Sequence, residues 1–297
     1  MNRILLTGST GFLGKNIYTD LCLNNNIFTL SRSNSNYNCD LINHIPNFNE
    51  NFDIVIHAAG LAHFTPKSDE DINTFFNSNV SITKNLLTGL EKIKINKFVF
   101  ISSVSVYGLL EGVEINEEQD LNALDPYGRS KVISEDLITK WCDLNDVKLT
   151  ILRLPIIVAK NPPGNLKYMI MGLKYGYYFN IAGGLARKSM VLASDVSKII
   201  INVAEIAGIY NLTDSYHPNF IELSTCISKQ LKKKHIFNMS FSFAIIISKI
   251  GDILGDWFPL NSVKLKKITS TLTFDDTKAK NAFNWDPENV LDCFKIN

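Results

Sequence analysis

Residues 3–14 read RILLTGSTGFLG, an apolar run followed at once by three closely spaced glycines. Gly8 permits a tight turn at the end of a strand, and Gly11 would let a phosphate approach the backbone. Gly14 would let the helix predicted from Phe12 onward pack closely on that strand. The N–H groups and the positive dipole end of this helix favour a pyrophosphate. The stretch therefore predicts a strand, a turn and a helix that bind a dinucleotide.

Apolar runs and helical patterns continue to alternate through the first half of the chain. We expect strands at residues 3–7, 27–31, 53–57, 97–102 and 149–154, and helices at residues 12–23, 72–92 and 127–144. Strands that are apolar on both faces are typical of a parallel sheet with helices on both sides. The sequence therefore predicts an α/β fold with a doubly wound parallel sheet of the Rossmann type.

The alternation weakens after the strand that ends at residue 154. Residues 159–165 (AKNPPGN) are typical of a loop, residues 209–213 (IYNLT) suggest a sixth strand, and the polar stretch 31–38 (SRSNSNYN) suggests a loop. We expect a dinucleotide-binding domain at residues 1–160, with its sheet completed by about residues 190–215. Residues 161–190 and 216–297 are expected to form a smaller, mostly helical C-terminal substrate lobe.

The overall composition limits the kinds of partner. The 297 residues are 45% hydrophobic and carry a formal net charge of +1, which gives no electrostatic reason to expect nucleic acid or an anionic membrane. The five cysteines are odd in number and include no CxxC, so we expect neither a disulfide framework nor a metal site. A reducing, cytoplasmic location fits this cysteine usage.

The most apolar stretch outside the predicted sheet is FAIIISKIGDILGDWF, residues 243–258. Lys249 and Asp252 interrupt it, and it is too short to span a bilayer. We expect a helix that is buried or faces a second subunit, in preference to a helix in contact with a membrane.

The end of the second predicted strand bears on the choice of dinucleotide. A carboxylate there would bind the adenosine ribose hydroxyls of NAD, but the chain has Ser31 and Arg32. An arginine suits a 2′-phosphate by its charge and its planar donors. We therefore favour NADP(H), with NAD(H) as the alternative if Arg32 stacks on adenine or points into solvent.

The stretch DPYGRSK, residues 125–131, places a tyrosine one helical turn before a lysine. Asp125 and Pro126 are typical of a helix start, so Tyr127 and Lys131 would share one face. A nearby ammonium group favours a phenolate, and lowering a tyrosine pKa from 10 to 7 requires about 4 kcal/mol. Such a tyrosine can exchange a proton with a substrate oxygen while hydride moves at the carbon. The spacing alone also fits a pair on a solvated helix surface.

A second stretch, FVFISSVSVYG at residues 98–108, supports the catalytic interpretation. It is a core strand that ends in Ser102 and Ser103, at the edge where an α/β sheet binds its ligands. The Ser103 hydroxyl could hold a substrate oxygen for Tyr127. Alternatively both serines, and Ser102 in particular, bind backbone groups at the end of the strand.

Taken in order, the glycine turn, HAAG (57–60), SNV (78–80), SSVSVYG (102–108) and PYGRSK (126–131) resemble the extended short-chain dehydrogenase/reductase family. This is the NAD-dependent epimerase/dehydratase group, and the most similar branch contains the nucleotide-sugar 4-epimerases and 4-keto-sugar reductases. The resemblance extends to about residue 215 and weakly to NAFNWDP (281–287).

The resemblance implies a role for each matching residue. Ser103, Tyr127 and Lys131 would be catalytic, and Lys131 would also hold the nicotinamide ribose. The implied cofactor contacts are Gly8, Thr10, Gly11, Phe12, Leu13, Gly14, Ser31, Arg32, Asp40, Leu41, Ala58, Ala59, Gly60, Asn79, Ser102, Tyr127, Lys131 and Pro155. The implied substrate contacts are Ser103, Ser105, Tyr127, Asn165, Arg187 and Lys188, although either of the last two could equally be solvated. Neither His57 nor His63 is expected to be a ligand.

Two departures from the family pattern narrow the chemistry. Val104 and Ser105 replace the Asp-Glu pair that dehydratases use to eliminate water, which argues against a dehydratase. Ile156 and Ile157 stand where epimerases often carry an asparagine, which weakens a match to UDP-galactose 4-epimerase.

Three functional hypotheses follow. The first is an NADPH-dependent reductase that acts at C4 of a 4-keto-6-deoxyhexose attached to a nucleoside diphosphate, in the supply of polysaccharide precursors. The alternative is a 4-epimerase of the UDP-hexose type with tightly held NAD. The third is a non-catalytic dinucleotide sensor, which would not need the three catalytic residues. Family analogy also suggests a homodimer formed through the helices at residues 75–92 and 127–141.

Overall fold

The computed structural model of the chain describes residues 1–62, 68–233, 236–255, 258 and 260–296. His63 lies outside the described residues.

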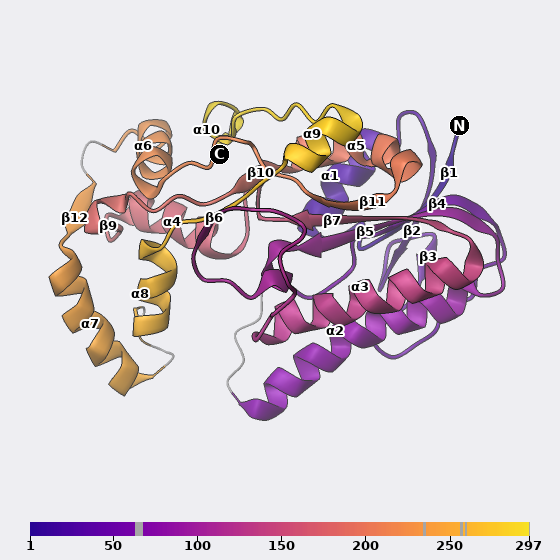
Figure 1. Cartoon of the computed structure of the whole chain (residues 1–297), viewed down its shortest axis with the longest axis horizontal. Coiled ribbons are helices and arrows are strands. Elements are labelled where there is room, and N and C mark those ends of the chain that lie inside the picture. Colours follow the sequence, from indigo (N-terminus) through magenta and orange to yellow (C-terminus); the bar gives the residue numbers. More distant parts are fainter. Residues whose placement is uncertain (63–67, 234–235, 256–257, 259, 297) are drawn as a thin grey trace.

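A seven-stranded parallel sheet forms the centre of the molecule, with the strand order β11-β7-β5-β4-β1-β2-β3 (Figure 1). Its strands are β1 (Arg3–Thr7), β2 (Asn26–Ser31), β3 (Tyr37–Asn38), β4 (Phe52–His57), β5 (Ile95–Ser103), β7 (Lys148–Leu154) and β11 (Gly208–Asn211). The chain leaves β1 toward β2 on one side and reaches β4 on the other side. This confirms the predicted doubly wound α/β fold and all six predicted strands.

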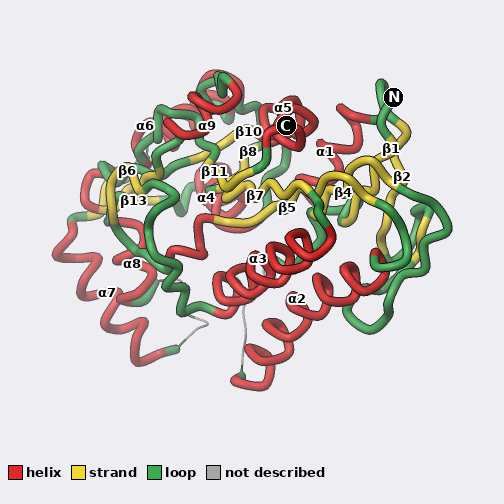
Figure 2. Tube along the Cα trace, turned by 45° about the vertical axis from the view of Figure 1, so that its right-hand side comes forward, coloured by secondary structure: helices red, strands yellow, loops and turns green. Residues whose placement is uncertain are grey.

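Helices cover both faces of this sheet. One layer consists of α2 (Asp69–Leu90) and α3 (Pro126–Asn145), which lie side by side in Figures 1 and 2. The other layer consists of α1 (Phe12–Leu21), α5 (Ala193–Ile206) and α9 (Thr277–Phe283). In β1, Ile4 and Leu6 face α1 and α5, whereas Leu5 faces the α2–α3 layer, and all three are fully buried. The continuous apolar runs of the sequence therefore reflect burial on both faces.

The expectation of a loop throughout residues 31–38 is wrong at its end. Tyr37 and Asn38 form β3, which pairs in parallel with Leu30 and Ser31. The Tyr37 ring packs edge-on against Phe48, with 5.1 Å between ring centroids. β3 is a short strand at the edge of the sheet, and the packing of one aromatic side chain holds it. Its sequence therefore has no alternating apolar pattern from which a strand could be predicted.

The smaller lobe contains helices and three two-stranded sheets. Its helices are α4 (Gly164–Tyr175), α6 (Phe220–Gln230), α7 (Phe241–Leu254), α8 (Ser262–Thr269) and α10 (Val290–Cys293). The strand pairs are β8 (Ile156–Val158) with β10 (Met190–Leu192), β9 (Phe179–Ile181) with β12 (Phe237–Met239), and β6 (Gly112–Ile115) with β13 (Leu272–Phe274). The pairing of β6 with β13 joins the first half of the chain to its C-terminal part.

The apolar stretch from residue 243 forms α7. The alternative that this helix is buried within the chain is wrong, whereas the alternative that it faces a second subunit stays a prediction. Only Ala244, Ser248 and Gly251 are buried among its residues. Within the described part of the chain, every helix is too short or too polar to cross a membrane.

Candidate functional site

The glycine turn has the geometry that a dinucleotide pyrophosphate requires. Gly8 has a φ of 73°, and its N–H donates to the carbonyl of Leu30 over 3.1 Å. A Cβ on Gly8 would lie 2.7 Å from the nitrogen of Ala59, and a Cβ on Gly14 would overlap the carbonyl oxygen of Gly8. Gly11 is the N-cap of α1 and provides no side-chain cap. The first N–H groups of this helix therefore have no side-chain acceptor at Gly11, and the arrangement fits an NAD(P) pyrophosphate.

Several predicted cofactor residues have side chains that are engaged inside the protein. Leu13 and Leu41 belong to the hydrophobic core, so only their backbone groups could face a cofactor. The Ser31 hydroxyl donates to the carbonyl of Ser33 over 2.7 Å. Asp40 accepts from the side chain of Asn43 over 2.8 Å and caps its own turn.

Arg32, by contrast, is exposed directly after β2. The hydrogen bonds and ion pairs of the described residues give its guanidinium no partner, and Thr10 in the glycine turn is also exposed. The side chain of Arg32 is therefore available to a ligand at the carboxyl end of β2. Its contacts do not decide whether the cofactor is NADP or NAD.

The loop after β4 is fastened by Asn79 of α2. The Asn79 Oδ1 atom accepts from the N–H of Leu61 over 2.7 Å, and its Nδ2 donates to the Leu61 carbonyl over 3.0 Å. The N–H of Ala59 donates to the hydroxyl of Thr7 over 3.2 Å. A Cβ on Gly60 would lie 3.5 Å from Lys131 Nζ, so this glycine lies directly beside the lysine. The backbone at Gly60 therefore lies beside both Asn79 of α2 and Lys131 of α3.

Helix α3 begins where the sequence predicts and positions the tyrosine and the lysine. The Asp125 carboxylate accepts from the N–H of Gly128 over 3.0 Å, and Pro126 occupies the first turn. Lys131 is 7% exposed, and its Nζ donates to the carbonyl of Ile101 over 2.9 Å. The same nitrogen lies 4.6 Å from the ring centroid of Phe100 and 6.0 Å from that of Tyr127. Tyr127 and Lys131 therefore point to the same side.

Ser103 lies at the end of β5, where the chain enters the short 3₁₀ helix Val104–Tyr107. Its Oγ accepts from the N–H of Ser105 over 3.2 Å. The Ser103 side chain lies close enough to the hydroxyl of Tyr127 to lower the pKa of that phenol, so the two hydroxyl groups are neighbours. The fold thus brings together Ser103, Tyr127 and Lys131, while Pro155 follows β7 and is half-buried.

The charge states differ from what the sequence predicts. Burial raises the pKa of Tyr127 to about 12, against a lowering effect of Ser103, and the ammonium of Lys131 is not among its causes. Burial also lowers the pKa of Lys131 to about 8, opposed by Glu135. The prediction that Lys131 brings the pKa of Tyr127 toward 7 is wrong, because the pKa of Lys131 lies below that of Tyr127 and the lysine has lost its charge before the buried phenol titrates.

A buried polar network under the site was not predicted. The Ser102 hydroxyl donates to Glu135, whose other oxygen accepts from Arg153 over 2.7 Å. Arg153 also donates to the hydroxyl of Tyr107 over 3.2 Å, and Tyr107 donates to Asn211 over 2.7 Å. The side chain of Ser102 thus has a structural partner rather than a cofactor. One signal was available: an arginine inside the apolar strand LTILRL requires a buried acceptor.

Some of the predicted substrate contacts are hydrogen-bonded within the protein, whereas others are free to bind a ligand. Arg187 donates to the carbonyls of Tyr216 and His217, over 3.3 Å and 2.9 Å, and thus holds a turn. Asn165 is exposed in the first turn of α4. Lys188 is half-buried, and burial together with the nearby Lys267 lowers its pKa to about 8. Of the two basic residues, Lys188 is therefore better placed to bind a phosphate.

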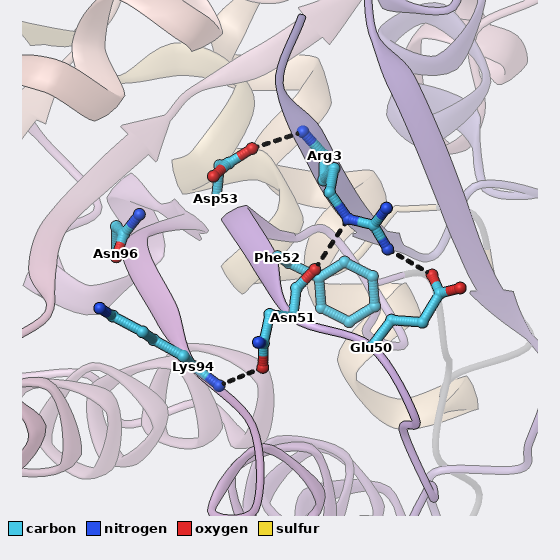
Figure 3. A pocket seen from close by; sticks show the side chains of 7 residues that line it. All are labelled: Arg3, Glu50, Asn51, Phe52, Asp53, Lys94 and Asn96. Atoms are coloured by element: carbon cyan, nitrogen blue, oxygen red, sulfur yellow. Dashed lines mark hydrogen bonds and ion pairs between the residues drawn. The ribbon is translucent and has the colours of Figure 1, made fainter.

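An open hollow of about 460 Å³ lies at the opposite edge of the sheet, where β1 and β4 begin (Figure 3). Three of its charged residues are joined to one another: the Arg3 guanidinium donates to Glu50 over 2.6 Å, and the N–H of Arg3 donates to Asp53 over 2.8 Å. Ligands of doubly wound sheets bind at the carboxyl ends of the strands, so this hollow is not the candidate site.

Comparison with known proteins identifies a family. The family described as "NAD dependent epimerase/dehydratase family" matches residues 4–212. A relative from Escherichia coli O157:H7 is N-acetyl-alpha-D-glucosaminyl-diphospho-ditrans,octacis-undecaprenol 4-epimerase, 26% identical over 93% of this chain and 88% of its own. A second relative is the decarboxylating sterol-4-alpha-carboxylate 3-dehydrogenase of Dictyostelium discoideum, 26% identical over 94% of both chains.

Solved structures share the fold across nearly the whole chain. UDP-glucuronic acid 4-epimerase from Bacillus cereus, in complex with NAD, has a TM-score of 0.75 and 17% identity over 97% of this chain and 92% of its own. RMD from Pseudomonas aeruginosa, complexed with NADPH, has a TM-score of 0.73 and 19% identity over 97% and 95% of the two chains. At these identities the likeness shows the fold, and a nicotinamide dinucleotide is the ligand common to both neighbours.

Proposed function

Because this chain belongs to the NAD dependent epimerase/dehydratase family, we propose that it is a 4-epimerase of a hexose carried on a diphosphate. This reverses the order in which the sequence placed the reductase and the epimerase. The relatives favour the reversal, since they include an undecaprenol-linked N-acetylglucosamine 4-epimerase and several UDP-sugar 4-epimerases. The diphosphate is common to both kinds of substrate, whether its far end carries uridine or a polyprenol.

The observation that carries the proposal is that Ser103 lies near the hydroxyl of Tyr127, beside buried Lys131. In this arrangement Ser103 would hold the C4 oxygen, and Tyr127 would take and later return its proton. Bound NAD(P) supplies the acceptor and donor of hydride. Lys131 and the backbone around Gly60 would hold its nicotinamide end, and the glycine turn would hold its pyrophosphate.

Tyr127 needs a different protonation state to donate a proton to the substrate than to take one from it. With a pKa of about 12 the phenol stays protonated at neutral pH, so it can donate to a keto oxygen without further change. Acting as a base at pH 7 requires a shift of about 5 units, or roughly 7 kcal/mol. A positive charge must supply this shift, and Lys131 is the buried cation near the ring. Ligand binding would therefore have to bring the ammonium closer to the phenol.

This protonation state favours a second candidate function. A 4-keto-sugar reductase needs Tyr127 only as a proton donor, and exposed Arg32 suits the 2′-phosphate of NADPH. The reductase thus stays a specific alternative to the epimerase.

One experiment separates the two candidates. The purified protein is denatured to identify any released nicotinamide nucleotide. Native protein is then incubated without added cofactor with UDP-glucose, with UDP-N-acetylglucosamine and with N-acetylglucosaminyl-diphospho-undecaprenol. An epimerase gives the C4 epimer by nuclear magnetic resonance with no net change in absorbance at the NADH band. Absence of epimer, together with NADPH consumption on a UDP-4-keto-6-deoxyhexose, would overturn the epimerase and establish the reductase.

A further inference from the structure

Helix α7 presents its large apolar side chains to solvent and its small ones to the protein. The buried residues Ala244, Ser248 and Gly251 face α8, and the nearest neighbour of a Cβ on Gly251 would be the carbonyl of Leu260. The opposite side exposes Phe243 at 55%, Ile246 at 58%, Ile250 at 46% and Ile253 at 85%. The usual pattern of a surface helix is thus inverted, which marks an interaction surface. We call these four residues the α7 apolar face.

Aromatic side chains precede this face in the chain. β12 leads directly into α7, and its Phe237, 56% exposed, pairs with Phe179 of β9 with 5.9 Å between ring centroids. Tyr175 and Tyr177, both more than half exposed, stack before β9. Figure 1 shows α7, β12 and β9 together at one end of the molecule, away from the central sheet. Exposed tyrosine rings such as these two are enriched where proteins meet the interfacial region of a bilayer.

The same part of the chain is strongly basic, although the whole chain is nearly neutral. Residues 229–269 carry eight lysines and two aspartates, whereas the net charge of the complete chain is +1. Lys249 is exposed on α7, and Lys266 and Lys267 are exposed on α8, where Lys266 pairs with Glu111 over 3.5 Å. Asp252 is engaged by the N–H of Ser262 at the start of α8, over 2.9 Å. An apolar helix face within a lysine-rich region is complementary to the interface of an anionic bilayer.

We propose that the α7 apolar face inserts into the interfacial layer of an anionic lipid bilayer and brings the enzyme to a diphosphate-linked sugar whose carrier is a membrane lipid. This rests on the proposed function, and it selects the polyprenol-linked form of the substrate over the nucleotide-linked form. α7 has 14 residues and contains Lys249, so it would lie along the membrane surface and not cross it.

The position of the candidate phosphate ligands agrees with this orientation. Lys267 of α8 lies close enough to Lys188 for the two charges to interact, and α8 packs directly against α7. A diphosphate bound by Lys188 and Lys267 would therefore lie one helix away from the membrane surface, so its lipid chain could remain in the bilayer.

A second copy of this chain is a less suitable occupant of the face. In a twofold contact across α7, the same lysine-rich segment approaches itself, and the like charges repel across the rim. An anionic bilayer neutralises those lysines instead.

The test is co-sedimentation of the full chain with vesicles of phosphatidylcholine and phosphatidylglycerol, and with vesicles of phosphatidylcholine alone. We expect binding to the anionic vesicles that weakens with added salt. The double variant Ile250→Glu/Ile253→Glu should bind at least about tenfold more weakly, since the loss of one buried isoleucine is by itself of that order. Leu23→Glu, which changes a 78% exposed leucine after α1, is the matched control and should bind like the wild type.

Three results would overturn the proposal. The first is that the wild-type protein stays in the supernatant, and the second is that the double variant binds vesicles as tightly as the wild type. The third is that the double variant differs from the wild type only by the loss of a dimer in sedimentation analysis. The last result would assign the face to a second copy. Thermal melts by circular dichroism confirm that both variants are folded. No sugar is present in the vesicle assay, so its failure is independent of the epimerase assay on UDP-sugars.

Discussion

The ammonium group of Lys131 donates a 2.9 Å hydrogen bond to the carbonyl of Ile101, the residue two positions before Ser103. Helix α3 and strand β5 are thereby joined at the point where the candidate catalytic residues meet. This hydrogen bond holds the lysine beside the phenol of Tyr127, with its Nζ 6.0 Å from the ring centroid. In the proposed epimerase, Tyr127 can act as a base near neutral pH only if its pKa falls well below about 12.

Replacement of Tyr127 by phenylalanine should reduce turnover by about 10²–10⁴-fold, because it removes the proton donor and acceptor. Binding of NAD(P), measured by fluorescence titration, should be unchanged within a few fold. Tyr18→Phe, at a 42% exposed position on α1, is the control and should retain full turnover. Retained activity in the Tyr127 variant would show that another group transfers the proton.

Replacement of Lys131 by methionine should change how stability depends on pH. The pKa of Lys131 falls from 10.5 in the unfolded chain to about 8 in the folded protein, so between these values the unfolded state binds more protons. The wild type should therefore gain up to about 3 kcal/mol of stability as pH rises from 8 to 10.5, and the variant should lack this gain. Urea denaturation at pH 7.5 and pH 10 measures it; parallel pH dependence in both proteins would contradict the shift.

Replacement of Glu135 by glutamine should destabilise the protein by about 3–5 kcal/mol, because it leaves the buried charge of Arg153 without its partner. Glu135 and Arg153 have side chains only 5% and 3% exposed. The matched control on the same helix is Asp136→Asn, which breaks an exposed pair with Lys140 and should cost less than about 1 kcal/mol. Equal effects of the two substitutions in urea denaturation would contradict the structural role of the network.

Replacement of Arg32 by serine should weaken NADPH binding by about tenfold or more and leave NADH binding nearly unchanged, if Arg32 binds the 2′-phosphate. Titration of both cofactors against both proteins gives the ratio. A variant that loses affinity for both cofactors equally would indicate stacking on adenine, and an unchanged variant would place Arg32 in solvent.

The local parts of the site were predictable because each depends on neighbours in sequence. The turn at Gly8 and the helix start at Asp125 formed where the sequence placed them. Strands β1, β2, β4, β5 and β7 were recognisable because both of their faces are buried. β3 was not, since an edge strand held by Tyr37 leaves no periodic pattern.

The roles of side chains whose partners are distant in the sequence could not be predicted from the sequence. Ser102 was expected near the cofactor, but its hydroxyl donates a hydrogen bond to Glu135, which lies on helix α3. Arg187 was a candidate phosphate ligand, but a turn formed by residues 216–217 engages its guanidinium. The near-zero net charge also concealed the basic segment at residues 229–269, because the rest of the chain is acidic.

By itself, the sequence determined the doubly wound sheet, the phosphate-binding turn and the spacing of Tyr127 and Lys131, since these follow from backbone conformation and from apolar periodicity within short segments. Only the tertiary structure decided the partner of Lys131, the pKa of Tyr127 and which side of α7 meets solvent. These depend on burial and on contacts between residues far apart in the chain. Both form only when the helices pack against the sheet and against one another.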